Sequence, residues 1–183
     1  EDVALPDGVR PEFNIEGDPR HDLINLVLNA QPDQCTLVPV VPGEVTSQAG
    51  WSESTEPRDM RRIVRRLRDA GIRVSLFIDP EPEAVRWAAD RGADRVELYT
   101  EPYAAAFARG ADEGRASFET YAEAARLAHQ LGLGVNAGHD LDLANLALFR
   151  GLPFLAEVSI GHALVSRALF VGLETVVREY LAV

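Results

Sequence analysis

The stretch GIRVSLFIDPEPEAVRWAADRGADRVELYT, residues 71–100, decides the fold class. It contains an apolar run at 73–79, a helical pattern at 80–92 and a second apolar run at 95–100. Both runs are nearly continuous in apolar residues, which is typical of strands buried on both faces of a parallel sheet. Two such strands joined by a helix and short connections predict a right-handed βαβ unit.

The same alternation continues on both sides of this unit. Four more apolar runs lie at 11–17, 34–40, 134–139 and 157–162. Amphipathic helical patterns stand between or after them, at 57–71, 117–132 and 163–181. Asp18 and Pro19 predict a helix start, with Asp18 as the N-cap. Six strands alternating with helices predict a single α/β domain over residues 1–183.

Alternation alone fits both a doubly wound open sheet and a (β/α)8 TIM barrel. The barrel is favoured because polar residues lie at or near the C-terminal ends of four predicted strands, where barrel enzymes keep their chemistry. These residues are Glu16, Glu97, His139 and His162. A complete barrel has eight β/α units and about 250 residues. We therefore expect about six of the eight units in this chain of 183 residues.

Charge and composition limit the possible functions. The formal net charge is −11, which makes a nucleic-acid or anionic-membrane partner a poor expectation. Neither a membrane-length apolar run nor a secretory signal pattern is present, so we expect a cytoplasmic protein. Small phosphorylated ligands remain possible, because backbone amides can hold them locally. The single cysteine, Cys35, lies in an apolar run, which predicts a buried, reduced thiol.

Two Gly-His pairs follow the last two predicted strands, in NAGHD at 136–140 and in SIGHA at 159–163. Glycine lets the backbone approach a ligand, and the amides that open the following helix favour an anion. The imidazoles could contact phosphate or transfer protons. Each pair could also be a turn with a structural histidine, but two pairs at matching points favour a functional role. No metal-binding or cofactor-binding motif is present.

Two carboxylates interrupt otherwise apolar strands. Glu16 and Glu97 would each cost several kcal/mol to bury as an unpaired charge. Either carboxylate could form a structural salt bridge, or it could have a raised pKa and act as a proton acceptor. His21 and His129 lie within helical patterns instead, and we expect surface or packing roles for them.

Two predicted loops lie at the same end of the barrel. Residues 41–51, VPGEVTSQAGW, are a candidate lid, in which Thr46 and Ser47 could donate hydrogen bonds to phosphate. Residues 101–114 are predicted as a second long loop, with Arg109 as a possible phosphate partner. Either segment could also be an ordinary surface loop.

Several motifs occur together in one order: FNIEG, CTLVPV, GEVTSQAGW, VSLFID, RVELYTEPYA, VNAGHDL and SIGHAL. In this combination the chain resembles the PdxJ family, the pyridoxine 5′-phosphate synthases, along essentially its whole length. The resemblance implies a (β/α)8 barrel that assembles into an octamer. It also implies that the six runs are strands three to eight, and that the family's first two strands are missing from this chain.

The resemblance further implies a reaction. The family condenses 1-deoxy-D-xylulose 5-phosphate with 3-amino-2-oxopropyl phosphate to pyridoxine 5′-phosphate, inorganic phosphate and water, without a metal or organic cofactor. Glu16 resembles the proton acceptor, His139 the proton donor and Glu97 the carboxylate that stabilises the transition state. The positions that match substrate-binding residues are Thr46, Asp140 (where many members have Gly), Gly161 and His162.

Two other classes of function stay open. The chain could be another phosphate-binding barrel enzyme, an isomerase or a lyase, or a non-catalytic homologue that binds a sugar phosphate. The sequence contains no lysine, which excludes a lysine Schiff-base mechanism for this chain.

Overall fold

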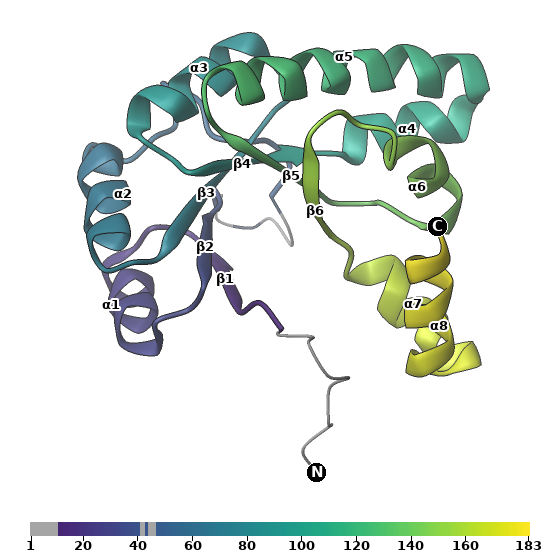
Figure 1. The fold of residues 1–183 in the computed structure, drawn as a ribbon, viewed down its shortest axis with the longest axis horizontal. Helices are drawn as coiled ribbons and strands as arrows, with labels where there is room; N and C mark the ends of the chain where they lie inside the picture. The colour runs from purple at the N-terminus through teal and green to yellow at the C-terminus, as the bar shows by residue number, and fades with distance from the viewer. Residues whose placement is uncertain (1–10, 41–42, 44–46) are drawn as a thin grey trace.

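A computed structural model describes residues 11–40, 43 and 47–183. Within this part of the chain, six parallel strands form one sheet, and each strand pairs with the next in sequence (Figure 1). They are β1 (Asn14–Gly17), β2 (Gln34–Leu37), β3 (Arg73–Ile78), β4 (Arg95–Tyr99), β5 (Gly134–Gly138) and β6 (Leu155–Ser159). All carboxyl ends therefore meet at one rim.

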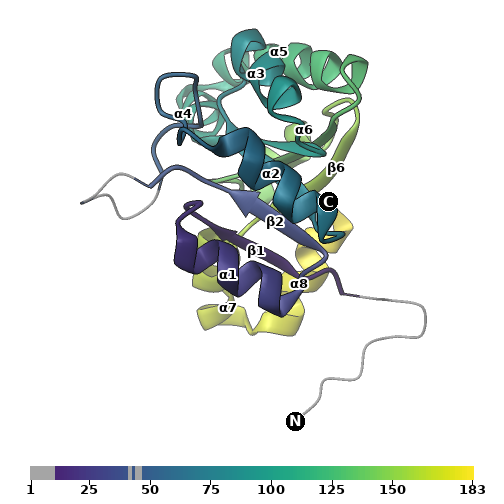
Figure 2. The same ribbon diagram turned by 90° about the vertical axis from the view of Figure 1, so that its left-hand side faces the viewer.

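The helices between successive strands lie on the outer side of the curled sheet, and two further helices follow β6 (Figures 1 and 2). They are α1 (His21–Ala30), α2 (Met60–Asp69), α3 (Pro82–Arg91), α4 (Glu101–Arg109), α5 (Ala111–Gln130), α6 (Leu143–Phe149), α7 (His162–Val171) and α8 (Leu173–Ala182). A doubly wound sheet would carry helices on both faces. The architecture is that of a partial TIM barrel, which confirms the predicted fold class.

Three local predictions are wrong. Helix α1 begins at His21 with Arg20 as its N-cap, so Asp18 does not cap it. The loop expected at 101–114 is helical, because α4 starts at Glu101 and α5 follows directly after Gly110. The long final helix is broken in two at Gly172, which has a φ of 87°, a left-handed conformation that interrupts the helical hydrogen bonds.

The two faces of the sheet differ in character. Outward side chains such as Val74, Leu76 and Leu98 are buried in the main core together with residues of the outer helices. Inward positions are polar, and Glu157 accepts a hydrogen bond from Asn136 at 2.9 Å. The strands are therefore less uniformly apolar than expected, because alternate residues point into a polar barrel interior.

The single cysteine behaves as predicted. Cys35 is a free thiol, fully buried in β2. Burial raises the pKa of this thiol to about 12, with a smaller contribution from the charge of Glu16. A thiol with so high a pKa is a poor nucleophile at neutral pH. For the helices within the described ranges, none has both the length and the apolar character needed to cross a membrane.

Candidate active site

A cavity of about 760 Å³ opens at the rim where the carboxyl ends of the strands meet. It is lined by Glu16, Glu97, His139, Asp140, Leu141, Asp142, Ser159, Ile160, Gly161, His162 and Ala163. Six of the seven candidate site residues therefore line one cavity, although they are up to 146 positions apart in sequence (16 to 162). The seventh, Thr46, lies outside the described residues. Its neighbour Ser47 donates a hydrogen bond to the carbonyl of Pro39 at 2.5 Å.

Glu97 lies in the interior of the barrel, where its carboxyl group is almost completely buried. The residue is only 2% exposed, and its Oε2 has no hydrogen-bond partner among the residues described. Burial, and then the charge of Glu16, raise the pKa of Glu97 to about 8, although Ser159 and Thr36 partly oppose the shift. This carboxyl group is therefore protonated at neutral pH.

Gly138 makes room for this carboxyl group. A Cβ atom at position 138 would overlap with Oε1 of Glu97, which lies on the neighbouring strand. A larger residue at position 138 would therefore displace the carboxyl group of Glu97 from its observed position.

Glu16 is the second carboxyl group of the cavity. It accepts a hydrogen bond from Asn14 Nδ2 at 3.0 Å. Burial raises the pKa of Glu16, and the hydrogen bond from Asn14 partly opposes this. In the part of the chain that the structure covers, neither Glu16 nor Glu97 forms a salt bridge. The structural ion pair considered for these residues is therefore not observed, and both acids remain available to a ligand.

His139 stands on an unusual turn. Its φ is 82° and that of Asp140 is 55°, so two successive residues other than glycine are left-handed. This conformation favours glycine, so His139 and Asp140 keep it only where neighbouring groups hold the turn. The carbonyl of Asp140 accepts a hydrogen bond from Asn145 Nδ2 at 2.9 Å, which holds the turn against α6.

The imidazole of His139 packs against two aromatic rings. Its centroid lies 4.9 Å from that of Phe77 and 5.4 Å from that of Tyr99. Burial lowers the pKa of His139, and the carboxylate of Asp140 partly opposes this. In the absence of a ligand the imidazole is therefore mostly neutral at neutral pH.

The second Gly-His pair lies at the start of a helix. Gly161 is the N-cap of α7 and His162 is its first residue, and no side chain caps this helix end. Gly161, His162 and Ala163 all line the cavity. The free amides of the first turn and the helix dipole make this end suitable for an anion.

Further residues support the site that were not predicted. Asp142 caps α6 in a capping box with Asn145, and this pair orders the segment just after His139. Its D-x-x-N spacing is a recognisable variant of the capping-box pattern, so it could have been found in the sequence. Thr100, the residue between β4 and α4, donates a hydrogen bond to the carbonyl of Gly138 in the same turn, and no local pattern indicates that contact.

The predicted lid returns to the barrel at Gly50 and Trp51. The Trp51 backbone N–H donates to Phe77 O at 2.8 Å, and its indole Nε1 donates to Leu37 O at 2.9 Å. A Cβ atom at Gly50 would overlap with the backbone of Ile78 and Asp79. This end of the loop is therefore closely packed against the ends of β2 and β3.

Arg109 does not belong to the cavity. Its Nε donates to Glu113 at 2.5 Å, and both side chains are more than half exposed. The interpretation of Arg109 as a phosphate partner is not supported by this position.

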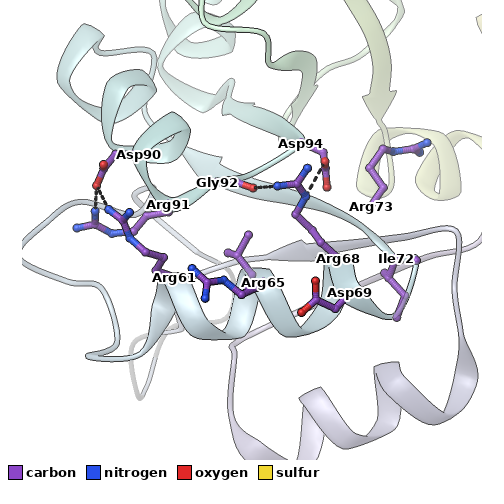
Figure 3. A pocket seen from close by; sticks show the side chains of 12 residues that line it. Arg61, Arg65, Arg68, Asp69, Ile72, Arg73, Asp90, Arg91, Gly92 and Asp94 are labelled. Carbon is purple, nitrogen blue, oxygen red and sulfur yellow. Dashed lines mark hydrogen bonds and ion pairs between the residues drawn. The ribbon is translucent and has the colours of Figure 1, made fainter.

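A second cleft, of about 660 Å³, lies between the C-terminal ends of α2 and α3 (Figure 3). It is at the opposite end of the barrel, because its turns lead into β3 and β4. Its arginines are mostly paired: Arg61 and Arg91 both contact Asp90, and Arg68 contacts Asp94 at 2.9 Å. These ion pairs hold α2 to α3 and to the turn before β4, so we assign this cleft no chemistry.

Comparison with known proteins identifies the family. The family model described as "Pyridoxal phosphate biosynthesis protein PdxJ" matches residues 1–183. The chain belongs to the PdxJ family. Pyridoxine 5′-phosphate synthase from Cytophaga hutchinsonii is 52% identical to it over 174 residues, which are 94% of this chain and 72% of that protein. The enzyme of the same name from Flavobacterium johnsoniae is 47% identical over the same shares of the two chains.

Solved structures of lower identity share the fold of this PdxJ family member. A mandelate oxidase superposes with a TM-score of 0.60 at 17% identity, over 94% of this chain and 55% of that one. An HpcH/HpaI aldolase/citrate lyase family protein from Burkholderia cenocepacia superposes with a TM-score of 0.57 at 14% identity, over 96% of this chain and 76% of that one. At such identities the likeness concerns the barrel alone.

Proposed function

We propose that this PdxJ family member acts in vitamin B6 biosynthesis as a pyridoxine 5′-phosphate synthase. It condenses 1-deoxy-D-xylulose 5-phosphate with 3-amino-2-oxopropyl phosphate and releases inorganic phosphate and water. The observation that carries the proposal is one cavity that holds two carboxyl groups with raised pKa values, a half-buried imidazole and an open helix N-terminus. Two relatives that share about half of its residues have this name.

The reaction needs acid–base groups of this kind. The amine must add to a ketone, and the resulting carbinolamine must lose water, so one group takes a proton from nitrogen or carbon and another protonates the departing oxygen. In our proposal Glu16 is the proton acceptor, because burial makes its carboxylate more basic than a carboxylate in water. His139 protonates the departing oxygen.

Glu97 has a different role in this scheme. With a pKa of about 8 it is a neutral acid at pH 7, and a neutral carboxyl group can donate a hydrogen bond to an oxygen that gains negative charge in the transition state. Its unpartnered Oε2 is consistent with such a contact.

The phosphate groups of the substrates also change the charge state of the site. A bound phosphate near His139 raises the pKa of the imidazole, since an opposite charge favours the imidazolium form. Bound substrate therefore increases the fraction of His139 in its charged, proton-donating form. The start of α7, with Gly161 and His162, is the proposed phosphate site. The carboxylate of Asp140 lines the same cavity and weakens anion binding there.

The direct test is an assay with both phosphorylated substrates. Purified protein is incubated with the pair, and the product is followed by its absorbance and its mass. We expect pyridoxine 5′-phosphate from the pair and none when either substrate is omitted. Folded protein that makes no product would contradict the proposal and favour another phosphate-binding barrel enzyme or a non-catalytic homologue.

Self-association and a cytoplasmic location belong to the same proposal. Helices α7 and α8 expose several large apolar side chains, including Leu169 at 82%, Phe170 at 88% and Leu181 at 82%. Several exposed large apolar side chains on two neighbouring helices are typical of contact sites. It supports assembly of the chain, for which the family resemblance implies an octamer.

A further inference from the structure

Thr100 lies at the junction of β4 and α4 and is completely buried. Its hydroxyl is within hydrogen-bond reach of two carbonyl oxygens of the β5–α6 turn, that of Gly138 at 2.6 Å and that of His139. Its backbone N–H also donates to Gly138 O, at 2.9 Å. The residue that follows β4 and caps α4 therefore contacts both peptide groups that flank His139.

These contacts lie at a backbone segment with an unfavourable conformation. His139 and Asp140 both have positive φ values, and residues with side chains keep such values only when their surroundings impose them. From the α6 side the turn is held at Asp140 O by Asn145. From the sheet side, the contacts of Thr100 to Gly138 O and His139 O hold it.

The direction of the His139 side chain follows from this backbone geometry. The dihedral angles at residue 139 set the Cα–Cβ direction, so a rotation of the adjoining peptide groups would turn the imidazole relative to the cavity. Tyr99, which precedes Thr100, forms one of the two aromatic walls of the imidazole. The end of β4 therefore holds both the backbone and the ring of His139.

We propose that Thr100 is a positioning residue for His139, whose hydroxyl holds the Gly138 and His139 carbonyls so that the imidazole faces the substrate cavity. Thr100 itself does not line the cavity and does not touch the substrate. The inference rests on the proposed role of His139 as the acid of the condensation.

The kinetic test compares Thr100→Val, which keeps the shape and removes the hydroxyl donor, with Thr100→Ser, which keeps the donor. Misplacing a catalytic group by about 1 Å can cost roughly 10²-fold in rate. We expect Thr100→Val to lower kcat by about 10–100-fold with KM within about 2-fold, and Thr100→Ser to recover most of the loss. Thr120→Val, on the exposed face of α5, is the matched control and should behave as wild type.

A double variant separates positioning from general damage. In the His139→Asn background there is no acid to orient, so adding Thr100→Val should change kcat by less than about 2-fold. A full additional loss in that background would overturn the proposal, because Thr100 would then act independently of His139. Wild-type kcat in folded Thr100→Val would overturn it as well.

A second readout does not depend on activity. Titration of protein with isotope-labelled histidine by NMR gives the pKa and environment of His139 directly, and we expect both to change in Thr100→Val and to be restored in Thr100→Ser. An unchanged His139 signal would contradict the inference even if the proposed reaction were wrong. If Thr100→Val does not fold, Thr100→Cys, a weaker donor of similar size, takes its place in every comparison.

Discussion

Glu97 is only 2% exposed, and burial of its carboxyl group should make the stability of the protein depend on pH. Its folded-state pKa of about 8 lies above the ordinary value of 4.5. Between these values the folded protein binds more protons than the unfolded chain, so the free energy of unfolding falls as pH rises from about 4.5 to about 8.

Replacing Glu97 with glutamine should therefore stabilise the protein at high pH while it impairs catalysis. Urea unfolding should give nearly equal free energies of unfolding for Glu97→Gln and wild type at low pH. Near pH 9 the free energy of unfolding of the variant should be larger by a few kcal/mol. Glu119→Gln, on exposed α5, controls for the lost charge. A difference that does not depend on pH would show that Glu97 is not a neutral acid.

The two Gly-His histidines should differ in kinetics. His139→Asn removes the proposed acid, so kcat should fall by about 10²–10⁴ with a modest change in KM. His162→Asn removes a contact at the start of α7, which should raise KM for a phosphorylated substrate more than it lowers kcat. Both variants are first tested for folding by thermal melting. If His139→Asn mainly raised KM and His162→Asn mainly lowered kcat, the roles assigned to the two histidines would be reversed.

Asp140 is both strained and of the wrong charge for a phosphate site. Asp140→Gly relieves a φ of 55° and should raise the free energy of unfolding by about 1 kcal/mol. It also removes a negative charge from the cavity lining, so KM for the phosphorylated substrates should fall. Asp140→Asn separates the two effects, since it removes the charge and keeps a side chain that tolerates this φ. A rise of KM in both variants would mean that the carboxylate contacts the substrate favourably.

The predicted lid depends on how its end is attached to β3. Gly50→Ala places a Cβ atom on the backbone of Ile78 and Asp79, which cannot move without breaking the sheet. We expect a loss of about 1–3 kcal/mol in the free energy of unfolding and a change in Trp51 fluorescence. Gly161→Ala is the stability control, because no atom lies within 4 Å of its added Cβ. Equal stability of the two variants would show that residues 50–51 are not firmly docked.

The whole chain presents apolar surface at α7 and α8. If this face is an assembly contact, Leu169→Glu and Phe170→Glu should shift the protein to smaller species in sedimentation velocity. Their melting behaviour should change little, because both side chains are more than 80% exposed. Leu26→Glu, an exposed site on α1, is the control. An unchanged sedimentation profile would place the assembly contact elsewhere.

Local sequence determined the strands, most helices and the family. Apolar periodicity is visible within a few residues of sequence. Val74 and Leu98 pack against helices because apolar side chains stand on the outward face of their strands. Glu16, Glu97 and the two Gly-His pairs could be singled out for a similar reason, since each stands at the end of a recognisable strand.

Tertiary structure alone decided how these residues act. The pKa of Glu97 depends on burial and on Glu16, which is distant in sequence. The turn of His139 is held by Thr100, which lies between β4 and α4. The curl of the sheet brings such residues together, and no local pattern records which distant groups will meet. The loop predicted at 101–114 is wrong for a related reason: Glu101 and Pro102 fit the first turn of α4, but the packing of α4 against α5 depends on tertiary structure.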